Sequence, residues 1–266
     1  MRLFLLIGLW LLPQFSYSAA QPDPFPQVAV AYFVELNGEV IWERQARKRL
    51  PIASLTKLMT ALLVLEQNQL QNVVNVSASA THETGSRINL KVGERFTVQD
   101  LLAATLMNSA NDACHALADH LAGDETAFVK LMNQRAQTLG LRDTHFQNAC
   151  GHDAPKHFSS TYDLARLAHE VLKHPQALPI TSQTHATIAT LDGKKYRLLN
   201  KNMMIGKYSG AIGLKTGYTS NAGKCLIALS KRGENEVLLV MLHGNDRWWD
   251  AADILDLAFD HARIAR

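Results

Sequence analysis

Segments with the pattern of β-strands lie at both ends of this chain, and segments with the pattern of helices lie between them. Residues 28–35 and 39–43 are rich in β-forming residues and flank Asn37-Gly38, a dipeptide typical of tight hairpin turns. Three segments near the other end have the same character: residues 211–215, 224–229 and 236–242. This arrangement predicts an α+β fold, in which the two chain ends form a mainly antiparallel sheet flanked by helices and a helical lobe, about residues 75–195, is inserted between them.

The expected helices have recognisable starts. Residues 54–65 are apolar on most sides over more than two turns, which predicts a helix buried in the middle of the fold. Thr97 and Ser160 each precede an acidic residue by three positions, a pattern similar to a capping box. Residues 247–262 predict a closing amphipathic helix. We interpret Arg247 as a helix-start arginine followed by core tryptophans; the alternative is an arginine that reaches a cleft and binds a carboxylate.

The N-terminus has the pattern of a secretory signal. Arg2 is followed by an apolar run over residues 3–13 and by Ser-Ala-Ala at 18–20, which suits a signal-peptidase site. The run is shorter than the roughly 20 residues that a transmembrane helix needs. We therefore expect residues 1–20 to be removed. Residues 21–266 should form a single catalytic domain, soluble in the periplasm or outside the cell, with no stable membrane anchor.

Three short motifs carry the chemistry of this sequence. They are Ser-Leu-Thr-Lys at residues 54–57, Ser-Ala-Asn at 109–111 and Lys-Thr-Gly at 215–217, and each occurs once. Each alone is a weak signal in a chain of this length. Their context is informative, because the first opens the buried helix, the second lies at a break between helices and the third ends an expected strand. Together they predict a nucleophilic active site.

The first motif pairs a nucleophile with a base. A serine hydroxyl is a poor nucleophile until a base takes its proton. Lys57 lies one helical turn after Ser54, so its amine can reach the hydroxyl. A lysine acts as a base only when neutral, and burial or a second cation such as Lys215 lowers its pKa. We therefore expect Ser54 to be the nucleophile and Lys57 its general base.

The second and third motifs supply supporting groups. Ser109 can relay a proton towards a leaving nitrogen, and Asn111 can hold both Lys57 and a substrate amide. Lys215 can bind an anionic substrate end by charge-assisted hydrogen bonds.

The strand of the third motif offers further substrate contacts through Thr216, Gly217 and Tyr218. The N–H groups of Ser54 and Tyr218 are candidates for an oxyanion hole. Ser54 also heads a helix, where the helix dipole favours a developing anion.

The motifs resemble those of penicillin-binding proteins and serine β-lactamases. The windows around them, residues 51–61, 106–112 and 213–223, are similar to the low-molecular-mass DD-peptidases, and the resemblance extends over about residues 25–262. It implies a β-lactamase/transpeptidase-like fold. It also implies a serine-type D-alanyl-D-alanine carboxypeptidase that acts on peptidoglycan stem peptides through an acyl-enzyme on Ser54. β-Lactam antibiotics would then be covalent inhibitors.

Two features depart from the family pattern. Many members carry a second, all-β domain and a C-terminal amphipathic anchor, whereas this chain ends at Arg266. We therefore expect a bare catalytic unit, as in the endopeptidase subgroup. In addition, Asn-Ala-Cys-Gly-His at residues 148–152 replaces the usual sequence of a loop near the substrate.

Other functions remain open to different degrees. A DD-endopeptidase that cuts D-Ala cross-links attacks the same type of carbonyl, so the motifs do not separate it from a carboxypeptidase. A class A β-lactamase uses a glutamate, a few tens of residues after the second motif, for deacylation. This sequence has no glutamate between Glu125 and Glu170, which argues against an efficient β-lactamase. A non-catalytic penicillin-binding module is disfavoured because the full catalytic set is present.

The remaining composition gives few further sites. With three cysteines, at most one disulfide forms; Cys114 with Cys150 is one possible pair, and Cys225 is the third cysteine. The histidines show no HExxH pattern and no two cysteines are close in sequence, so we expect neither a metal nor another cofactor. Lys and Arg number 27 against 24 Asp and Glu without a dense basic run, and we expect no nucleic-acid partner.

Overall fold

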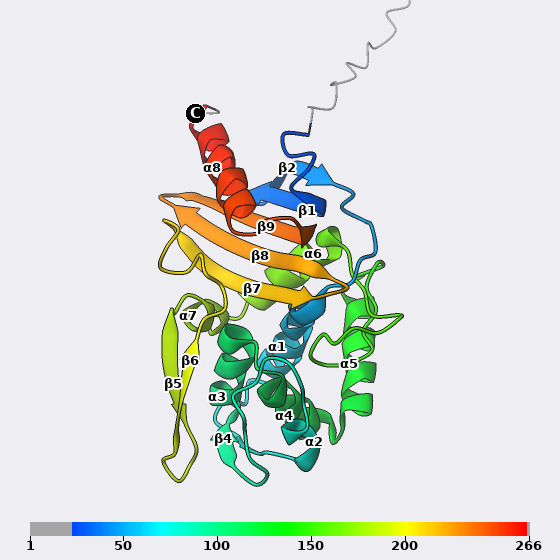
Figure 1. Cartoon of the computed structure of the whole chain (residues 1–266), viewed down its shortest axis with the longest axis vertical. Helices are drawn as coiled ribbons and strands as arrows, with labels where there is room; N and C mark the ends of the chain where they lie inside the picture. The colour runs from blue at the N-terminus through cyan, green and yellow to red at the C-terminus, as the bar shows by residue number, and fades with distance from the viewer. Residues whose placement is uncertain (1–22, 265–266) are drawn as a thin grey trace, which may run out of the picture.

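A computed structural model describes residues 23–264, so the expected signal segment lies outside the described residues. Its centre is a five-stranded antiparallel sheet with the strand order β2-β1-β9-β8-β7. The strands are β1 (Ala29–Leu36), β2 (Glu39–Arg44), β7 (Ala211–Thr219), β8 (Gly223–Arg232) and β9 (Asn235–Gly244). Figure 1 shows the first two strands in blue beside the last three in yellow and orange, so the two ends of the chain build one sheet.

The strand pairing follows from the predicted turn and from the register. Asn37 and Gly38 both have positive φ angles, 53° and 84°, as a two-residue hairpin requires. β1 then pairs with β9 from the other end of the chain, with Phe33 opposite Val240. This pairing confirms the expected antiparallel sheet.

Helices cover both faces of the sheet. α8 (Trp249–Ile264) packs on one face, where Leu239 and Ile254 belong to a shared apolar cluster. α6 (Thr161–Leu172) packs on the other face, and α1 (Lys57–Glu66) lies beside α6 in the larger core. In Figure 1, α1 runs from the lower edge of the sheet into the helical region.

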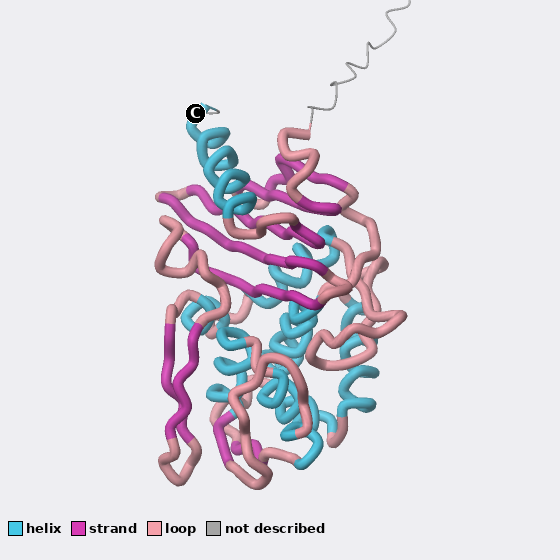
Figure 2. The backbone as a smooth tube through the Cα atoms, viewed as in Figure 1, coloured by secondary structure: helices cyan, strands magenta, loops and turns pink. Residues whose placement is uncertain are grey.

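The rest of the chain forms a mostly helical region below the sheet, seen in cyan in Figure 2. It contains η1 (Ala53–Thr56), α2 (Ala78–Thr81), α3 (Val98–Ala103), η2 (Ala104–Asn108), α4 (Asn111–Ala122), α5 (Glu125–Thr138) and α7 (Ala177–Thr181). It also contains two short hairpins, β3 (Val73–Asn75) with β4 (Arg95–Thr97) and β5 (His185–Ala189) with β6 (Lys195–Leu199). The predicted caps are present, since Thr97 accepts from the Asp100 N–H and Ser160 from the Asp163 N–H.

Three features differ from the sequence-based expectations. The β5–β6 hairpin was not predicted, because only Ile188 and Leu198 are buried and the alternation of apolar residues is weak. The third motif lies inside β7, which continues to Thr219, rather than at the end of a strand. Trp249 is 74% exposed and is therefore not a core tryptophan.

The structure contains one disulfide, between the two cysteines named above as a possible pair. Cys114 on α4 is bonded to Cys150, and Cys225 is free and buried. Within residues 23–264, no helix is both long and apolar enough to cross a membrane.

Candidate active site

The nucleophile candidate lies on a short, strongly constrained turn. Ser54 is part of the 3₁₀ turn η1, directly before α1. Ala53 before it has a left-handed φ of 47°, a costly conformation for a residue with a β-carbon. The hydroxyl of Thr56 donates to the Ala53 carbonyl at 2.8 Å, and the His157 ring lies 2.7 Å from that hydroxyl. These contacts hold the turn in place.

Two glycines from distant segments pack against the same turn. A β-carbon on Gly151 would lie 2.0 Å from the Ala53 carbonyl oxygen, and one on Gly217 would lie 3.1 Å from the Ser54 nitrogen. β7 and the loop of residues 148–152, called the 148–152 loop below, therefore approach the nucleophile through bare backbone.

Lys57 is fully buried and has three hydrogen-bond partners. Its Nζ lies 3.2 Å from Ser54 Oγ, 2.6 Å from Asn111 Oδ1 and 2.5 Å from the Cys150 carbonyl oxygen. Burial lowers the pKa of Lys57 to about 7, against the opposing effect of the negative charges of Glu83 and Asp112. A substantial fraction of Lys57 is thus neutral near pH 7, as a general base requires.

The second motif lies at a sharp break between helices, as predicted. Ser109 has a left-handed φ of 59°, and α4 begins at Asn111. The Asn111 side chain bridges two segments, because its Oδ1 accepts from Lys57 and its Nδ2 donates to the Thr84 carbonyl at 2.5 Å. This break turns Ser109 and Asn111 towards the two lysines of the site.

Lys215 joins the third motif to the second. It is buried on β7, and its Nζ donates to Ser109 Oγ at 2.9 Å and to the Thr216 carbonyl at 2.8 Å. Burial lowers its pKa well below the usual value, and the positive charges of Lys57, Arg247 and Lys201 lower it further. A positive charge on Lys57 therefore disfavours the charged form of Lys215.

The other expected substrate-binding residues lie along the same strand. Thr216 is buried and Gly217 packs on the nucleophile turn, while Tyr218 is 64% exposed. Arg247 Nη1 donates to the Gly217 carbonyl at 2.7 Å. Arg247 is thus more than a helix-start residue, because its side chain binds the backbone of the third motif.

Sequence reasoning missed the contribution of the 148–152 loop. The Cys150 carbonyl accepts from Lys57, and Gly151 contacts the nucleophile turn. A main-chain carbonyl leaves no signature in a sequence. The one available signal was the departure of this loop from the family pattern.

A cluster of ionisable side chains lies behind this loop. Ligand atoms of Glu83, His115 and Glu125 lie within 4.8 Å of one another and are close enough to hold a metal ion. Glu83 already accepts hydrogen bonds from His115 and His152, both 2.6 Å long, and Glu125 accepts from the Ala149 N–H at 2.9 Å. These hydrogen bonds join Glu83 and Glu125 to residues of the loop and to His115. We therefore interpret the cluster as a hydrogen-bond network that holds the 148–152 loop.

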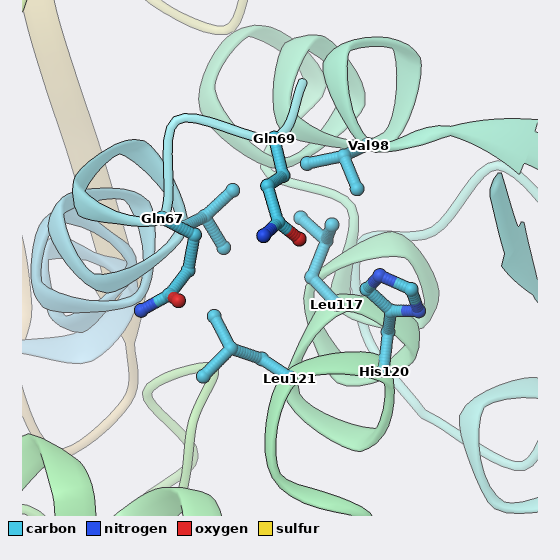
Figure 3. Close-up of a pocket in the computed structure, with 7 residues that line it drawn as sticks. Gln67, Gln69, Val98, Leu117, His120 and Leu121 are labelled. Carbon is cyan, nitrogen blue, oxygen red and sulfur yellow. The ribbon is translucent and has the colours of Figure 1, made fainter. Parts of the chain in front are cut away.

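Figure 3 shows a pocket elsewhere in the helical region. Its lining residues lie on or beside α1, α3 and α4, namely Val64, Gln67, Gln69, Val98, Leu117, His120 and Leu121. None belongs to the three motifs. The candidate site is the motif cluster between β7, α1 and α4.

The sequence matches a known family. The family model described as D-alanyl-D-alanine carboxypeptidase, peptidase S11, matches residues 20–246. The chain belongs to this family. D-alanyl-D-alanine carboxypeptidase DacF of Bacillus subtilis is 36% identical over 231 residues, which cover 84% of this chain and 59% of the relative. A D-alanyl-D-alanine endopeptidase of Pseudomonas aeruginosa is 33% identical over 222 residues, covering 82% and 71%. The chain thus spans about three fifths of DacF.

Solved structures of the family have the same fold. The DD-transpeptidase of Streptomyces K15 superposes with a TM-score of 0.83 at 28% identity and covers 90% of this chain and 99% of that one. Penicillin-binding protein D2 of Listeria monocytogenes, in its ampicillin-bound form, gives a TM-score of 0.75 at 35% identity and covers 88% and 98%. These similarities confirm the expected transpeptidase-like α+β fold.

Proposed function

We propose that this protein is a serine-type D-alanyl-D-alanine carboxypeptidase that removes the terminal D-Ala from peptidoglycan stem peptides through an acyl-enzyme on Ser54. The observation that carries the proposal is the buried Lys57 amine, within hydrogen-bond reach of the Ser54 hydroxyl. The membership of the chain in the S11 family and its carboxypeptidase relatives support the same reaction.

The partners of Lys57 suit a neutral amine. A neutral amine has two N–H donors and one lone pair. Asn111 Oδ1 and the Cys150 carbonyl are acceptors only, so they take the two N–H groups. The lone pair is then left for the third neighbour, the Ser54 hydroxyl. Lys57 accepts the hydroxyl proton as Ser54 Oγ forms its bond to the carbonyl carbon of the penultimate D-Ala.

Lys215 and Ser109 supply the proton for the leaving group. The Ser109 hydroxyl donates its proton to the leaving nitrogen and takes another from the Lys215 ammonium, 2.9 Å away. A positive charge on Lys57 lowers the pKa of Lys215, so the arrival of a proton on Lys57 favours the loss of one from Lys215. The C–N bond breaks and D-Ala leaves. Water then attacks the ester carbonyl and gives a proton to Lys215 through Ser109, while Lys57 returns its proton to Ser54 Oγ as the ester bond breaks.

The backbone around Ser54 and β7 would stabilise the tetrahedral intermediate. The contact of Gly217 with the Ser54 nitrogen brings the two segments together. We assign the oxyanion hole to the N–H groups of Ser54 and Tyr218. Lys215, Thr216 and Gly217 would bind the carboxylate end of the substrate.

β-Lactams would acylate Ser54 because they present a strained amide to the same groups. The ampicillin-bound form of the Listeria relative supports this assignment. Action on the cell wall outside the cytoplasm is supported by the signal-like N-terminus and by the Cys114–Cys150 disulfide, since disulfides persist in oxidising compartments.

The alternative function is a DD-endopeptidase that cuts D-Ala cross-links. It is supported by the Pseudomonas relative of that name. The attacked carbonyl belongs to D-Ala in both reactions, so the same residues would act in the same roles. The two functions differ in whether the leaving-group side of the site admits a second stem peptide.

One digestion separates these functions. The purified protein is incubated with a mixture of pentapeptide monomers and D-Ala cross-linked dimers, and the products are separated by chromatography and identified by mass spectrometry. Loss of one D-Ala from monomers, with dimers intact, supports the carboxypeptidase. Conversion of dimers into monomers supports the endopeptidase. No change in either pool, with Ser54→Ala as the blank, would contradict both.

A further inference from the structure

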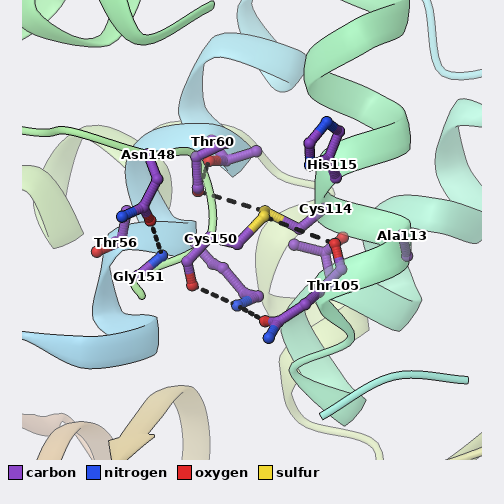
Figure 4. The surroundings of a disulfide bond; sticks show 12 residues. Thr56, Thr60, Thr105, Ala113, Cys114, His115, Asn148, Cys150 and Gly151 are labelled. Atoms are coloured by element: carbon purple, nitrogen blue, oxygen red, sulfur yellow. Dashed lines mark hydrogen bonds between the residues drawn. A yellow bond between two sulfur atoms is a disulfide. The ribbon is translucent and has the colours of Figure 1, made fainter. Parts of the chain in front are cut away.

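The disulfide joins the two segments that contact the general base Lys57. Cys114 is on the first turn of α4, three residues after Asn111, and Cys150 is in the 148–152 loop. Asn111 Oδ1 and the Cys150 carbonyl oxygen are the two groups that accept from Lys57. The bond between Cys114 and Cys150, drawn in Figure 4, therefore links the two segments that supply the acceptors.

The other contacts that hold the 148–152 loop are hydrogen bonds, including those of Glu125 with the Ala149 N–H and of Glu83 with His152. The Thr60 hydroxyl donates to the Ala149 carbonyl at 2.6 Å. Asn148 Oδ1 accepts from the N–H groups of Gly151 and His152 within the loop itself. Both bonded cysteines are fully buried. The disulfide is thus the covalent link between this loop and α4.

The size of the chain does not by itself call for a disulfide. A chain of 266 residues has a large core and does not depend on disulfides as small secreted domains do. The free Cys225 is buried elsewhere in the sheet, where its side chain contacts main-chain carbonyls. The bond joins the Cys150 segment to α4, and both supply oxygens that accept from Lys57, which relates the bond to the active site.

We propose that the Cys114–Cys150 disulfide is a positioning element for the general base, which holds the Cys150 carbonyl against Lys57 and so sets the pH range in which Ser54 is acylated. This inference rests on the proposed function of Ser54 and Lys57. It assigns a role to Cys150, which lies in the loop that departs from the family pattern.

The direction of the effect follows from the geometry. A dithiol reductant supplies two electrons and two protons, breaks the S–S bond and leaves two thiols. The sulfur atoms then separate from about 2.0 Å to about 3.5 Å or more. The carbonyl moves away from Lys57 and water reaches the amine.

Access of water changes the protonation of the base. Burial is the main reason for the low pKa of Lys57, and the negative charges of Glu83 and Asp112 oppose it. Another charged group near the site is Lys215 on β7, which the charge of Lys57 affects. Hydration of the amine therefore raises the pKa of Lys57 towards its ordinary value. Below the new pKa, the neutral fraction of Lys57 falls about tenfold for each unit of increase. Reduction is therefore expected to slow acylation near neutral pH and to leave it little changed at high pH.

The experiment measures the rate constant for acylation by a fluorescent penicillin from pH 5.5 to 9.5. The Cys225→Ala variant is the background, so that the thiols that change belong to the disulfide. The protein is compared oxidised, reduced and freed of reductant by gel filtration, and reoxidised. Thiol titration gives the redox state, and near-UV circular dichroism reports the fold. A Cys114→Ala/Cys150→Ala variant in the same background replaces the reduced form if that form unfolds.

On reduction, we expect the acidic limb of the pH–rate profile, where the acylation rate falls with falling pH, to shift to higher pH by about one unit or more. Reoxidation should reverse this shift. An unchanged limb, whether the rates are equal or uniformly lower, would overturn the inference and leave the disulfide a purely structural role. If the oxidised protein is not acylated at any pH, the proposed function fails and this inference fails with it.

Discussion

Gly151 lies so close to Ala53 that a β-carbon on Gly151 would stand 2.0 Å from the Ala53 carbonyl oxygen. Ala53 itself is left-handed and directly precedes the nucleophile. A Gly151→Ala substitution must therefore displace either the turn or the 148–152 loop. We expect it to lower the free energy of unfolding by about 3 kcal/mol or more and to slow acylation by penicillin at least tenfold.

Gly193 provides the matched control for this substitution. Its φ of 92° is almost equal to the 90° of Gly151, but open space surrounds the position of its β-carbon. Gly193→Ala should cost only the backbone strain, about 1–2 kcal/mol, and leave acylation unchanged. Urea unfolding and acylation rates measure both effects. Equal losses in the two variants would show that contact with Ala53 is unimportant.

Asn111→Asp should move the acidic limb of acylation to higher pH. The new carboxylate would stand next to the Lys57 amine, where Asn111 Oδ1 is now 2.6 Å away. An adjacent negative charge favours the ammonium form and raises the pKa of Lys57 by about 1–3 units. Since only neutral Lys57 acts as a base and its pKa now lies near 7, the rate at pH 7 should fall at least about fivefold and recover partly above pH 9.

Asn108→Asp is the control for added charge. Asn108 lies on the same break between helices, but its amide donates to the Leu199 carbonyl and not to a group of the site. Its pH profile should match that of the unsubstituted protein. A wild-type profile for Asn111→Asp as well would contradict the assignment of Lys57 as the base.

Glu83→Gln should make the protein less stable in a pH-dependent way. Burial raises the pKa of Glu83, but the hydrogen bonds and charges of His115 and His152 outweigh burial and lower this pKa to about 2. A folded-state pKa below the unfolded value stabilises the protein above about pH 4.5, and this contribution is lost as the pH falls towards 2. The loss in the variant should be about 2–3 kcal/mol at pH 7.

Urea unfolding at several pH values between 7 and 3 tests this prediction. The difference between Glu83→Gln and the unsubstituted protein should shrink steadily below pH 4.5. The exposed Glu39 on β2 offers the control, since Glu39→Gln removes the same charge without breaking such a network. A difference for Glu83→Gln that stays constant over this range would mean that its ionisation does not stabilise the fold.

Much of the fold could be predicted because local signals and the tertiary structure agree. Asn37-Gly38 adopts the turn that its sequence favours, and Thr97 caps α3 as expected. The β5–β6 hairpin was missed because it buries few side chains and lies on the surface, so its sequence has little periodicity. Pattern reasoning detects elements in proportion to the apolar face that they bury.

The part of the candidate site that is formed by side chains in sequence motifs could be predicted. Ser54, Lys57, Ser109, Asn111 and Lys215 were expected from their motifs, and the structure brings them together. The groups that were missed act through backbone and through contacts distant in sequence.

Two of these groups show why. The Cys150 carbonyl is invisible in a sequence because every residue has one. Arg247 was interpreted as a helix-start residue because nothing local reveals that its side chain reaches Gly217, 30 positions earlier.

The central claim is that Ser54 is the residue acylated, and it is tested most directly by locating the adduct. The protein is treated with a penicillin, digested and analysed by mass spectrometry, in parallel with Ser54→Ala. We predict one penicillin per chain, on the peptide that contains Ser54, and no adduct on the variant, whose melting temperature should match that of the unsubstituted protein. An adduct on another residue, or labelling that survives in the folded variant, would contradict the account.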